Sequence, residues 1–127
     1  MDLKQYFSDT NGTGVIATAD SDGKVDAAIY AKPYVLDEKT VVFIAADRLT
    51  RKNLKSNPRA AFLFMEAGEG FSGKRLFLTM TRESSGEGES EAGLVEWYEK
   101  SKEAYPKETL YLAYFRVDEV LPLVSEL

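Results

Sequence analysis

The chain has 127 residues, of which 44% are apolar and 12% aromatic, so it is expected to form one globular domain over residues 1–127 rather than a disordered tail. It contains neither cysteine nor histidine, which excludes a zinc site of the usual type, a thiolate nucleophile and a serine–histidine pair; we expect no metal. The formal net charge of -5 argues against a nucleic-acid binder or a protein of anionic membranes.

The first predicted element is a short amphipathic helix after Asp2, a good N-cap residue. Leu3, Tyr6 and Phe7 have the helical spacing i, i+3, i+4, and the pattern stops at residues 11–12. This N-terminal stretch has no features of a secretory signal, and no apolar run approaches the length of a membrane span. We therefore expect a cytoplasmic protein with no membrane partner.

A β-hairpin is predicted next, with strands at residues 14–19 and 25–36 around the turn at residues 20–23. Pro33 cannot donate a backbone hydrogen bond, so the second strand should be irregular there. The β-branched run at residues 40–46 favours a buried strand. After it the period changes to that of a helix, with Thr50 as its cap and Leu54 facing inward, and residues 57–58 end it.

The second half of the chain predicts three more strands and one helix. The strands lie at residues 60–65, 75–81 and 109–117, and the run at residues 68–73 is expected to connect two of them as a hairpin. The helix carries Leu94, Trp97 and Tyr98 and ends at residues 105–106. Six short strands and three helices indicate a mainly β fold, a small antiparallel barrel with flanking helices, although an OB-like barrel has the same size.

The basic segment at residues 47–59 has a local net charge of +4, whereas residues 82–108 have one of -4. A strand that ends in a polar turn and a capped helix presents free backbone amides beside Arg48, Thr50, Arg51 and Lys52, which suit a phosphate. A small anion fits this asymmetry better than a long polyanion. The alternative interpretation is an ordinary solvated basic helix face.

This segment carries a family resemblance. The motif R-x-T-x-K-N-L followed by N-P-R-A, after the hairpin GVIATADSDGKVDAAIYAKP, resembles the FMN-binding split-barrel family that includes the pyridoxamine 5'-phosphate oxidases. The likeness covers most of the chain and is weaker in the acidic linker and the last helix. It implies a six-stranded antiparallel split β-barrel, a homodimer, and one FMN per subunit at the interface.

The resemblance also implies cofactor-binding residues. Arg48 occupies the position of a phosphate-binding arginine, whereas Thr50 stands where many members have lysine, and Arg51 and Lys52 are neighbouring candidates. The second strand of such proteins lies along the flavin ring, and this position is held here by Ala28, Ile29, Tyr30 and Ala31. The alternative for that run is a plain strand interior. Lys32 and Arg75 are further candidates for contacts to the flavin or to the neighbouring subunit.

Other polar and aromatic residues receive no catalytic assignment. The carboxylates in turn-like contexts are expected to face solvent: Asp37, Glu38, Glu66 and Glu69. Trp97 and Tyr98 are expected to pack in the core or in a dimer contact rather than to form a substrate platform.

The function that this implies is an FMN flavoprotein, an oxidoreductase of the pyridoxamine 5'-phosphate oxidase-like family whose substrate or redox partner the residues do not identify. A non-catalytic flavin-binding or electron-carrier module and an OB-like nucleic-acid binder are the alternatives. The wider family also uses deazaflavin or haem. The homodimer is expected because so small a barrel cannot enclose a flavin ring, and its predicted contact surface is the last strand, with Tyr111, Tyr114 and Phe115, and the tail at residues 120–127.

Overall fold

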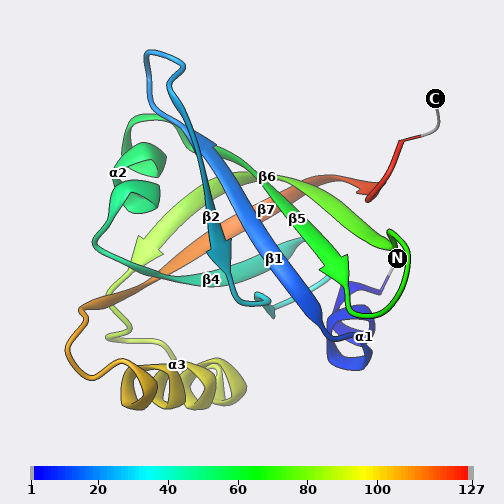
Figure 1. Cartoon of the computed structure of the whole chain (residues 1–127). Helices are drawn as coiled ribbons and strands as arrows, with labels where there is room; N and C mark the ends of the chain where they lie inside the picture. The colour runs from blue at the N-terminus through cyan, green and yellow to red at the C-terminus, as the bar shows by residue number, and fades with distance from the viewer. Residues whose placement is uncertain (1, 126–127) are drawn as a thin grey trace.

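The computed structural model describes residues 2–125, which form a seven-stranded antiparallel sheet and three helices (Figure 1). The helices are α1 (Leu3–Asp9), α2 (Leu49–Ser56) and α3 (Ala92–Ala104). The strands are β1 (Gly12–Ala19), β2 (Val25–Tyr30), β3 (Tyr34–Val35), β4 (Thr40–Ala46), β5 (Arg59–Glu66), β6 (Gly73–Ser84) and β7 (Leu110–Pro122). No helix within residues 2–125 is long and apolar enough to cross a membrane.

The order of the strands is β2-β1-β5-β6-β7-β4-β3, which confirms the predicted mainly β barrel. The predicted second strand is divided into β2 and β3 by residues 31–33, where Pro33 interrupts the pairing. The two longest strands, β6 and β7, shift register between Phe77 and Leu78 and between Met80 and Arg82. Such irregularities increase the bend and twist of a strand pair, which lets one sheet curl into a barrel.

The hairpin of β1 and β2 forms as predicted, because its turn residues supply their own hydrogen bonds. The Asp20 carboxylate accepts from the Asp22 and Lys24 amides, each at 2.9 Å. Gly23 follows with φ +85°, a conformation that favours glycine. The helix α1 is capped as expected, since the Asp2 carboxylate accepts from the Gln5 amide at 3.0 Å.

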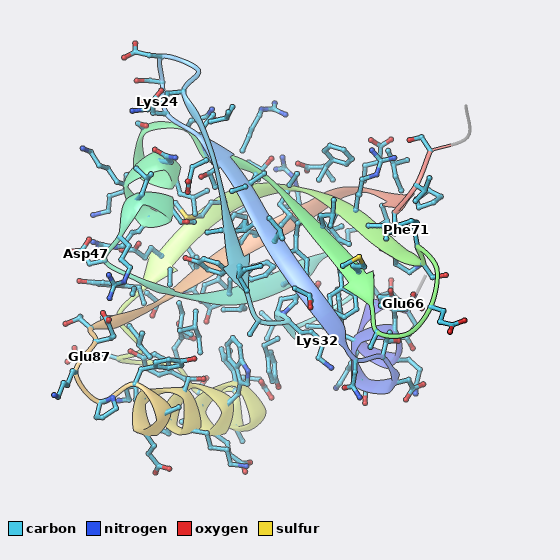
Figure 2. The ribbon with its side chains drawn as sticks, viewed as in Figure 1. Lys24, Lys32, Asp47, Glu66, Phe71 and Glu87 are labelled. Atoms are coloured by element: carbon cyan, nitrogen blue, oxygen red, sulfur yellow. The ribbon has the colours of Figure 1, made fainter. Side chains whose placement is uncertain are left out.

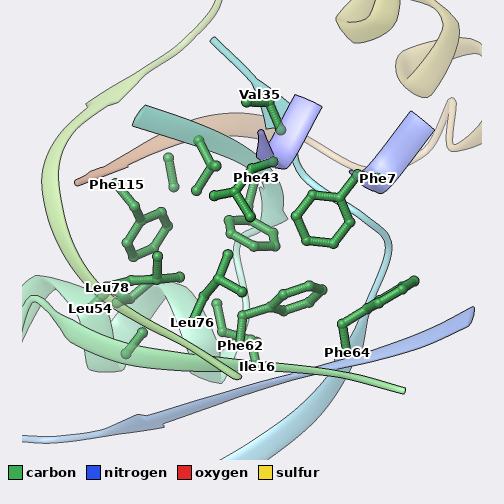
Figure 3. Packing of buried hydrophobic residues seen from close by; sticks show 14 residues of the cluster. Phe7, Ile16, Val35, Phe43, Leu54, Phe62, Phe64, Leu76, Leu78 and Phe115 are labelled. Atoms are coloured by element: carbon green, nitrogen blue, oxygen red, sulfur yellow. The ribbon is translucent and has the colours of Figure 1, made fainter. Parts of the chain in front are cut away.

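The main core fills the inside of the barrel, and its large members are aromatic (Figure 3). Phe43 lies between Phe62 and Phe115, with ring centroids 4.9 and 5.6 Å away in edge-on arrangements. Phe7 of α1 closes one end against Phe64, at 5.3 Å. The main core therefore buries rings contributed by α1, β4, β5 and β7.

A second cluster lies on the outer face of β4 and β7, where α3 packs. Leu94 and Tyr98 of α3 contact the same cluster as Val42 of β4 and Leu112 of β7. Because α3 covers this face, β4 is buried on both sides, as its continuous apolar run predicts. Tyr98 therefore packs as expected.

The last strand does not provide the contact surface that the sequence suggested. Tyr114 and Phe115 are buried, one in each cluster, and the ring of Tyr111 lies against Arg51, whose guanidinium carbon is 3.7 Å from the ring centroid. The expectation is wrong for Tyr114 and Phe115, because one face of this part of β7 packs on the main core and the other packs in the cluster under α3. Val124 of the tail is 56% exposed, so the tail stays a predicted contact surface. Residues 126–127 of the tail lie outside the described residues.

The start of α2 also differs from the prediction. Arg48, not Thr50, is the N-cap residue: its amide donates to the Ala46 carbonyl at 2.9 Å, and its own carbonyl accepts from the Lys52 amide at 3.1 Å. The helix thus begins directly after β4, and the expected Thr50 cap is wrong. Thr50 lies in the first turn and is buried, 4% exposed.

Candidate functional site

A cleft of about 540 Å³ opens where the barrel is split. One side is β2, an edge strand that pairs only with β1. The other sides are the end of β4, the start of α2, the inner face of α3 and the start of β7. In Figure 1 the helices α2 and α3 lie in the same half of the molecule, with β4 between them. The lining residues are Asp26, Ala28, Ile29, Tyr30, Ala31, Lys32, Ile44, Ala46, Arg48, Leu49, Thr50, Trp97, Ser101, Tyr105, Glu108 and Leu110.

Six of the eight predicted cofactor-binding residues line this cleft. Four come from β2 and the residue after it, and two come from the start of α2, so the fold brings together two segments that are 17 or more residues apart. They are Ala28, Ile29, Tyr30, Ala31, Arg48 and Thr50. The other two, Arg51 and Lys52, do not line it.

The N-terminus of α2 is electropositive. No side chain among the described residues caps it, so its first-turn amides are free to bind an anion. The Arg48 side chain beside it is 70% exposed and donates from a terminal nitrogen to the Glu108 carboxylate. This end of the cleft therefore offers an exposed guanidinium and free helix amides, which are donors suited to a phosphate.

Arg51 is held away from the cleft by two carboxylates. Its guanidinium donates to both Glu83 oxygens, at 2.9 and 2.7 Å, and to Asp47 at 2.8 Å. The hydrogen bonds to Glu83 raise the pKa of Arg51 above its ordinary value, although burial opposes them. Because its Nε and both terminal nitrogens each donate to a carboxylate, Arg51 fixes α2 to β6 rather than reaching a ligand.

Tyr30 contributes an uncharged phenol to the lining of the cleft. Burial raises the pKa of the Tyr30 phenol above its ordinary value. A hydrogen bond with Thr50 lowers this pKa, and the negative charge of Asp26 raises it further. The Tyr30 ring rests on Phe43 of the core, with centroids 6.3 Å apart. Tyr30 thus stays protonated near neutral pH and presents a fixed hydroxyl beside Thr50.

The two further cationic candidates are engaged elsewhere. The Lys32 ammonium donates to the carbonyls of Phe7 and Thr10 at 2.8 and 2.9 Å, which closes the end of α1 (Figure 2). Arg75 donates to the Pro122 carbonyl at 2.9 Å. Only the hydrocarbon stem of Lys32 is left to line the cleft.

The wall opposite β2 is formed by α3. Trp97, Ser101 and Tyr105 follow one another at i, i+4 and i+8, so one face of the helix and its C-cap line the cleft. The Trp97 ring packs against Tyr34, with centroids 5.6 Å apart, and the Ser101 hydroxyl donates to the Trp97 carbonyl at 2.9 Å. This wall is mostly apolar and aromatic.

Comparison with protein-family models matches residues 3–120 to the family described as pyridoxamine 5'-phosphate oxidase. The chain belongs to this family. Among curated proteins none matches it. This chain is similar in fold to an FMN-binding protein from Syntrophomonas wolfei subsp. wolfei, with a TM-score of 0.75 and 17% sequence identity. The match covers 98% of this chain and 84% of that chain.

Two further solved structures show the same fold. HupZ from Group A Streptococcus has TM-score 0.69 and 21% identity, with 98% of this chain and 93% of that chain covered. A protein described as an F420 reductase has TM-score 0.65 and 16% identity, with 95% of this chain and 98% of that chain covered. The split-barrel fold of this pyridoxamine 5'-phosphate oxidase family member is therefore established.

Sequence reasoning did not assign the side of the cleft formed by α3 and the loop after it to the site of this pyridoxamine 5'-phosphate oxidase family member. Its residues are Trp97, Ser101, Tyr105 and Glu108. Trp97 was expected to pack in a core or dimer contact, and it does pack against the second cluster, but it also lines the cleft. The spacing of residues 97, 101 and 105 was the available signal. Their partner surface is β2, which no local pattern connects with α3.

Proposed function

We propose that this protein is an FMN-binding flavoprotein and an oxidoreductase of the pyridoxamine 5'-phosphate oxidase family. The observation that carries the proposal is the cleft, which combines the exposed Arg48, the uncapped start of α2 and an edge strand of small residues. The likeness in fold to an FMN-binding protein supports the choice of cofactor.

The phosphate end suits a flavin mononucleotide. The Arg48 guanidinium can exchange the Glu108 carboxylate for a phosphate, because the pair is exposed and such pairs contribute little stability. The Thr50 hydroxyl and the first-turn amides of α2 would add donors on the same side. Arg51 would act indirectly, by holding α2 in place.

The remainder of the cleft suits a planar ring. Ala28 and Ala31 on one side and Ala46 on another carry only methyl side chains, so a flat group can approach the backbone closely. The neutral Tyr30 phenol avoids placing a charge against such a ring. Ile44 and Leu110 supply the apolar contacts that keep water away from it.

FMN, when bound, would supply electron or hydride transfer. The residues would bind and orient the cofactor and exclude water. Selective, rapid reduction of the flavin by one nicotinamide or one small metabolite would support an oxidoreductase. Slow reduction without preference among reductants would instead indicate an electron carrier.

The test of the cofactor site compares FMN with riboflavin, which lacks the phosphate. In Arg48→Ala we expect FMN affinity to fall by about one to two decades, because a charge-assisted hydrogen bond of roughly 1.5–3 kcal/mol is lost. Riboflavin affinity should stay unchanged. Both constants can be measured by quenching of flavin fluorescence on titration with protein freed of cofactor.

The control is Lys55→Ala, which removes a cation from the last turn of the same helix, outside the cleft. It should leave both affinities unchanged. Unaltered FMN binding in Arg48→Ala would refute the role of this arginine. The absorbance spectrum of cofactor released from the purified protein distinguishes FMN from a deazaflavin or a haem, and a colourless protein that takes up no FMN contradicts the whole proposal.

The homodimer belongs to the same proposal. The outer faces of β2, β1 and β5 are apolar, and strand register aligns Ile29, Val15 and Leu63 in one row and Ala27, Ala17 and Ala61 in the next. Ile29 is 71% exposed and also lines the cleft. A second subunit on this face would therefore border the cofactor, which supports a cofactor at the interface.

A further inference from the structure

The outer face of α2 presents a row of cations to solvent. Arg48, Lys52 and Lys55 follow one another at i, i+4 and i+7, so they lie on one face of the helix, and all three are exposed. The opposite face is the buried one, with Asn53 and Leu54. Because Arg48 lines the cleft, the row begins at the cleft and runs away from it along the helix.

This arrangement of charges opposes the stability of the helix. Like charges three or four residues apart repel, and a cation at a helix N-terminus with no acidic residue in the first turn is also unfavourable. Within residues 2–125, neither Lys52 nor Lys55 makes an ion pair. In α3, by contrast, Lys100 pairs with Glu96 at 3.0 Å. The two lysines of α2 are therefore free to attract a charge from outside the subunit.

The charge of the remaining chain makes this row the favoured approach for an anion. The net charge is -5 overall and +4 within residues 47–59, which leaves -9 for all other residues. An acidic surface repels an anion, whereas a local positive region attracts it and raises its local concentration. The row ends at Arg48 and the uncapped start of α2, so an anion drawn to it is drawn towards the cleft.

Lys52 and Lys55 are placed to act on the approach of an anion rather than on its bound state. Neither lines the cleft. Along the helix axis they lie about 4.5 and 9 Å beyond Leu49, the first residue of α2. A charge in such a position attracts an anion through its field without a hydrogen bond. Steering of this kind raises the rate of association more than it lowers the rate of dissociation.

We infer that the outer face of α2 is a capture surface for the anionic cofactor. Lys52 and Lys55 speed the arrival of FMN by attracting its phosphate, which carries a charge of about -1.5 to -2 at neutral pH, and they make no contact in the bound complex. The inference rests on the proposed function, because it takes FMN as the ligand and Arg48 as its final partner. It goes further in assigning to α2 a surface that controls the rate of cofactor uptake.

The test measures the association of FMN with protein freed of cofactor, by stopped-flow quenching of flavin fluorescence. The ionic strength is about 0.01 M, where the Debye length is about 30 Å. In Lys52→Gln/Lys55→Gln the association rate constant should fall by about threefold to fivefold, because two charges that attract the phosphate are removed. The dissociation rate constant should not change. Riboflavin, which has no phosphate, should associate equally fast with both proteins.

Salt and a charge-conserving variant separate this effect from binding. In about 0.5 M salt the Debye length falls to a few ångströms, so the association rates of wild type and double variant should converge. At about 0.15 M it is about 8 Å, shorter than the distance of Lys55 from the start of α2, so Lys55→Ala keeps its equilibrium affinity there. Lys52→Arg/Lys55→Arg preserves both charges and should preserve the association rate at every ionic strength.

The matched control is Lys4→Gln/Lys39→Gln, which removes the same total charge elsewhere. Lys4 belongs to α1, on the opposite side of the barrel from α2 (Figure 1), and the two lysines line a common surface pocket. Lys39 directly precedes β4, whose seven residues place it about 23 Å from the start of α2. This control should slow the association of FMN by less than about twofold at about 0.01 M.

The outcomes separate this inference from the proposed function. A protein that takes up no FMN overturns both. FMN binding with an unchanged association rate in Lys52→Gln/Lys55→Gln overturns the inference alone. So does an equal slowing in the Lys4 and Lys39 control, which would be an effect of net charge. Faster dissociation from the α2 double variant also overturns it, since the two lysines would then contact the bound cofactor.

Discussion

Tyr114 carries a phenol hydroxyl that is buried without a hydrogen-bond partner among the described residues. The Arg82 guanidinium carbon lies 3.6 Å from the centroid of its ring, so the face of the ring is covered as well. Burial raises the pKa of Tyr114 to about 12, and the neighbouring Glu89 carboxylate acts in the same direction, whereas Arg82 opposes both. The folded protein therefore resists ionisation of this phenol.

The raised pKa predicts a loss of stability in alkali. The neutral phenol is favoured in the folded state, so its contribution is complete below the unfolded pKa of about 10 and is lost as pH rises towards 12. Tyr114→Phe should reduce this loss and, by removing an unpaired buried hydroxyl, stabilise the protein at pH 7 by about 1 kcal/mol. Urea unfolding at several pH values from 7 to 11.5 measures both effects. An equal alkaline loss in the variant would contradict the assignment.

The helix α2 has eight residues, too few to be stable alone, and tertiary contacts hold its N-terminus in place. Leu54 inserts into the main core, and the buried Asn53 side chain donates to the Thr18 hydroxyl at 3.1 Å. Arg51 adds the bidentate pair with Glu83 and the contact with the Tyr111 ring. These contacts place the α2 amides at the cleft.

At the level of this element, Arg51→Met should destabilise the protein by roughly 1.5–3 kcal/mol, because Glu83 is left half-buried without its partner. The affinity for FMN should also fall, because the phosphate end of the cleft moves. The affinity for riboflavin, which has no phosphate, should fall less. Lys55→Ala on the same helix is the stability control. Chemical unfolding and flavin titration provide the two measurements, and a variant as stable as wild type would show that Arg51 does not anchor α2.

On the scale of the whole molecule, the outer face of β2, β1 and β5 carries apolar side chains that the subunit leaves exposed. Val25 and Ile29 of β2 are 79% and 71% exposed, and Leu63 and Met65 of β5 are 38% and 39% exposed. Aligned apolar rows on a sheet of this kind are typical of an isologous contact, in which the same surface serves both copies.

The proposed dimer predicts that Leu63→Glu weakens self-association at least about tenfold, because a carboxylate would be buried without a partner near the twofold axis. Leu63 does not line the cleft, so the variant leaves the cofactor residues in place. Ser90→Glu, an equal change of charge in the exposed linker, is the control. Sedimentation velocity with FMN present gives the masses, and a wild-type monomer at every concentration would refute the dimer.

The sequence alone determined the features that depend on neighbours along the chain. Asp2 and the spacing of Leu3, Tyr6 and Phe7 predicted α1, residues 20–23 predicted the hairpin turn, and the alternating and β-branched runs predicted the strands. The basic motif that begins at Arg48 and the run at residues 28–31 identified most of one side of the cleft. These follow from side-chain periodicity and turn chemistry, which act over a few residues.

The tertiary structure alone decided how distant groups pair. Arg51 and Arg48 look equivalent in the sequence, but they pair with different carboxylates. Arg51 donates to Glu83, 32 residues away, whereas Arg48 donates to Glu108, 60 residues away, at the cleft. Trp97 and Tyr98 are adjacent, yet only Trp97 lines the cleft, because the rotation of α3 on β4 and β7 sets which side chain faces β2. Barrel closure brings such segments together, and it is governed by packing across the whole sheet, which no local pattern encodes.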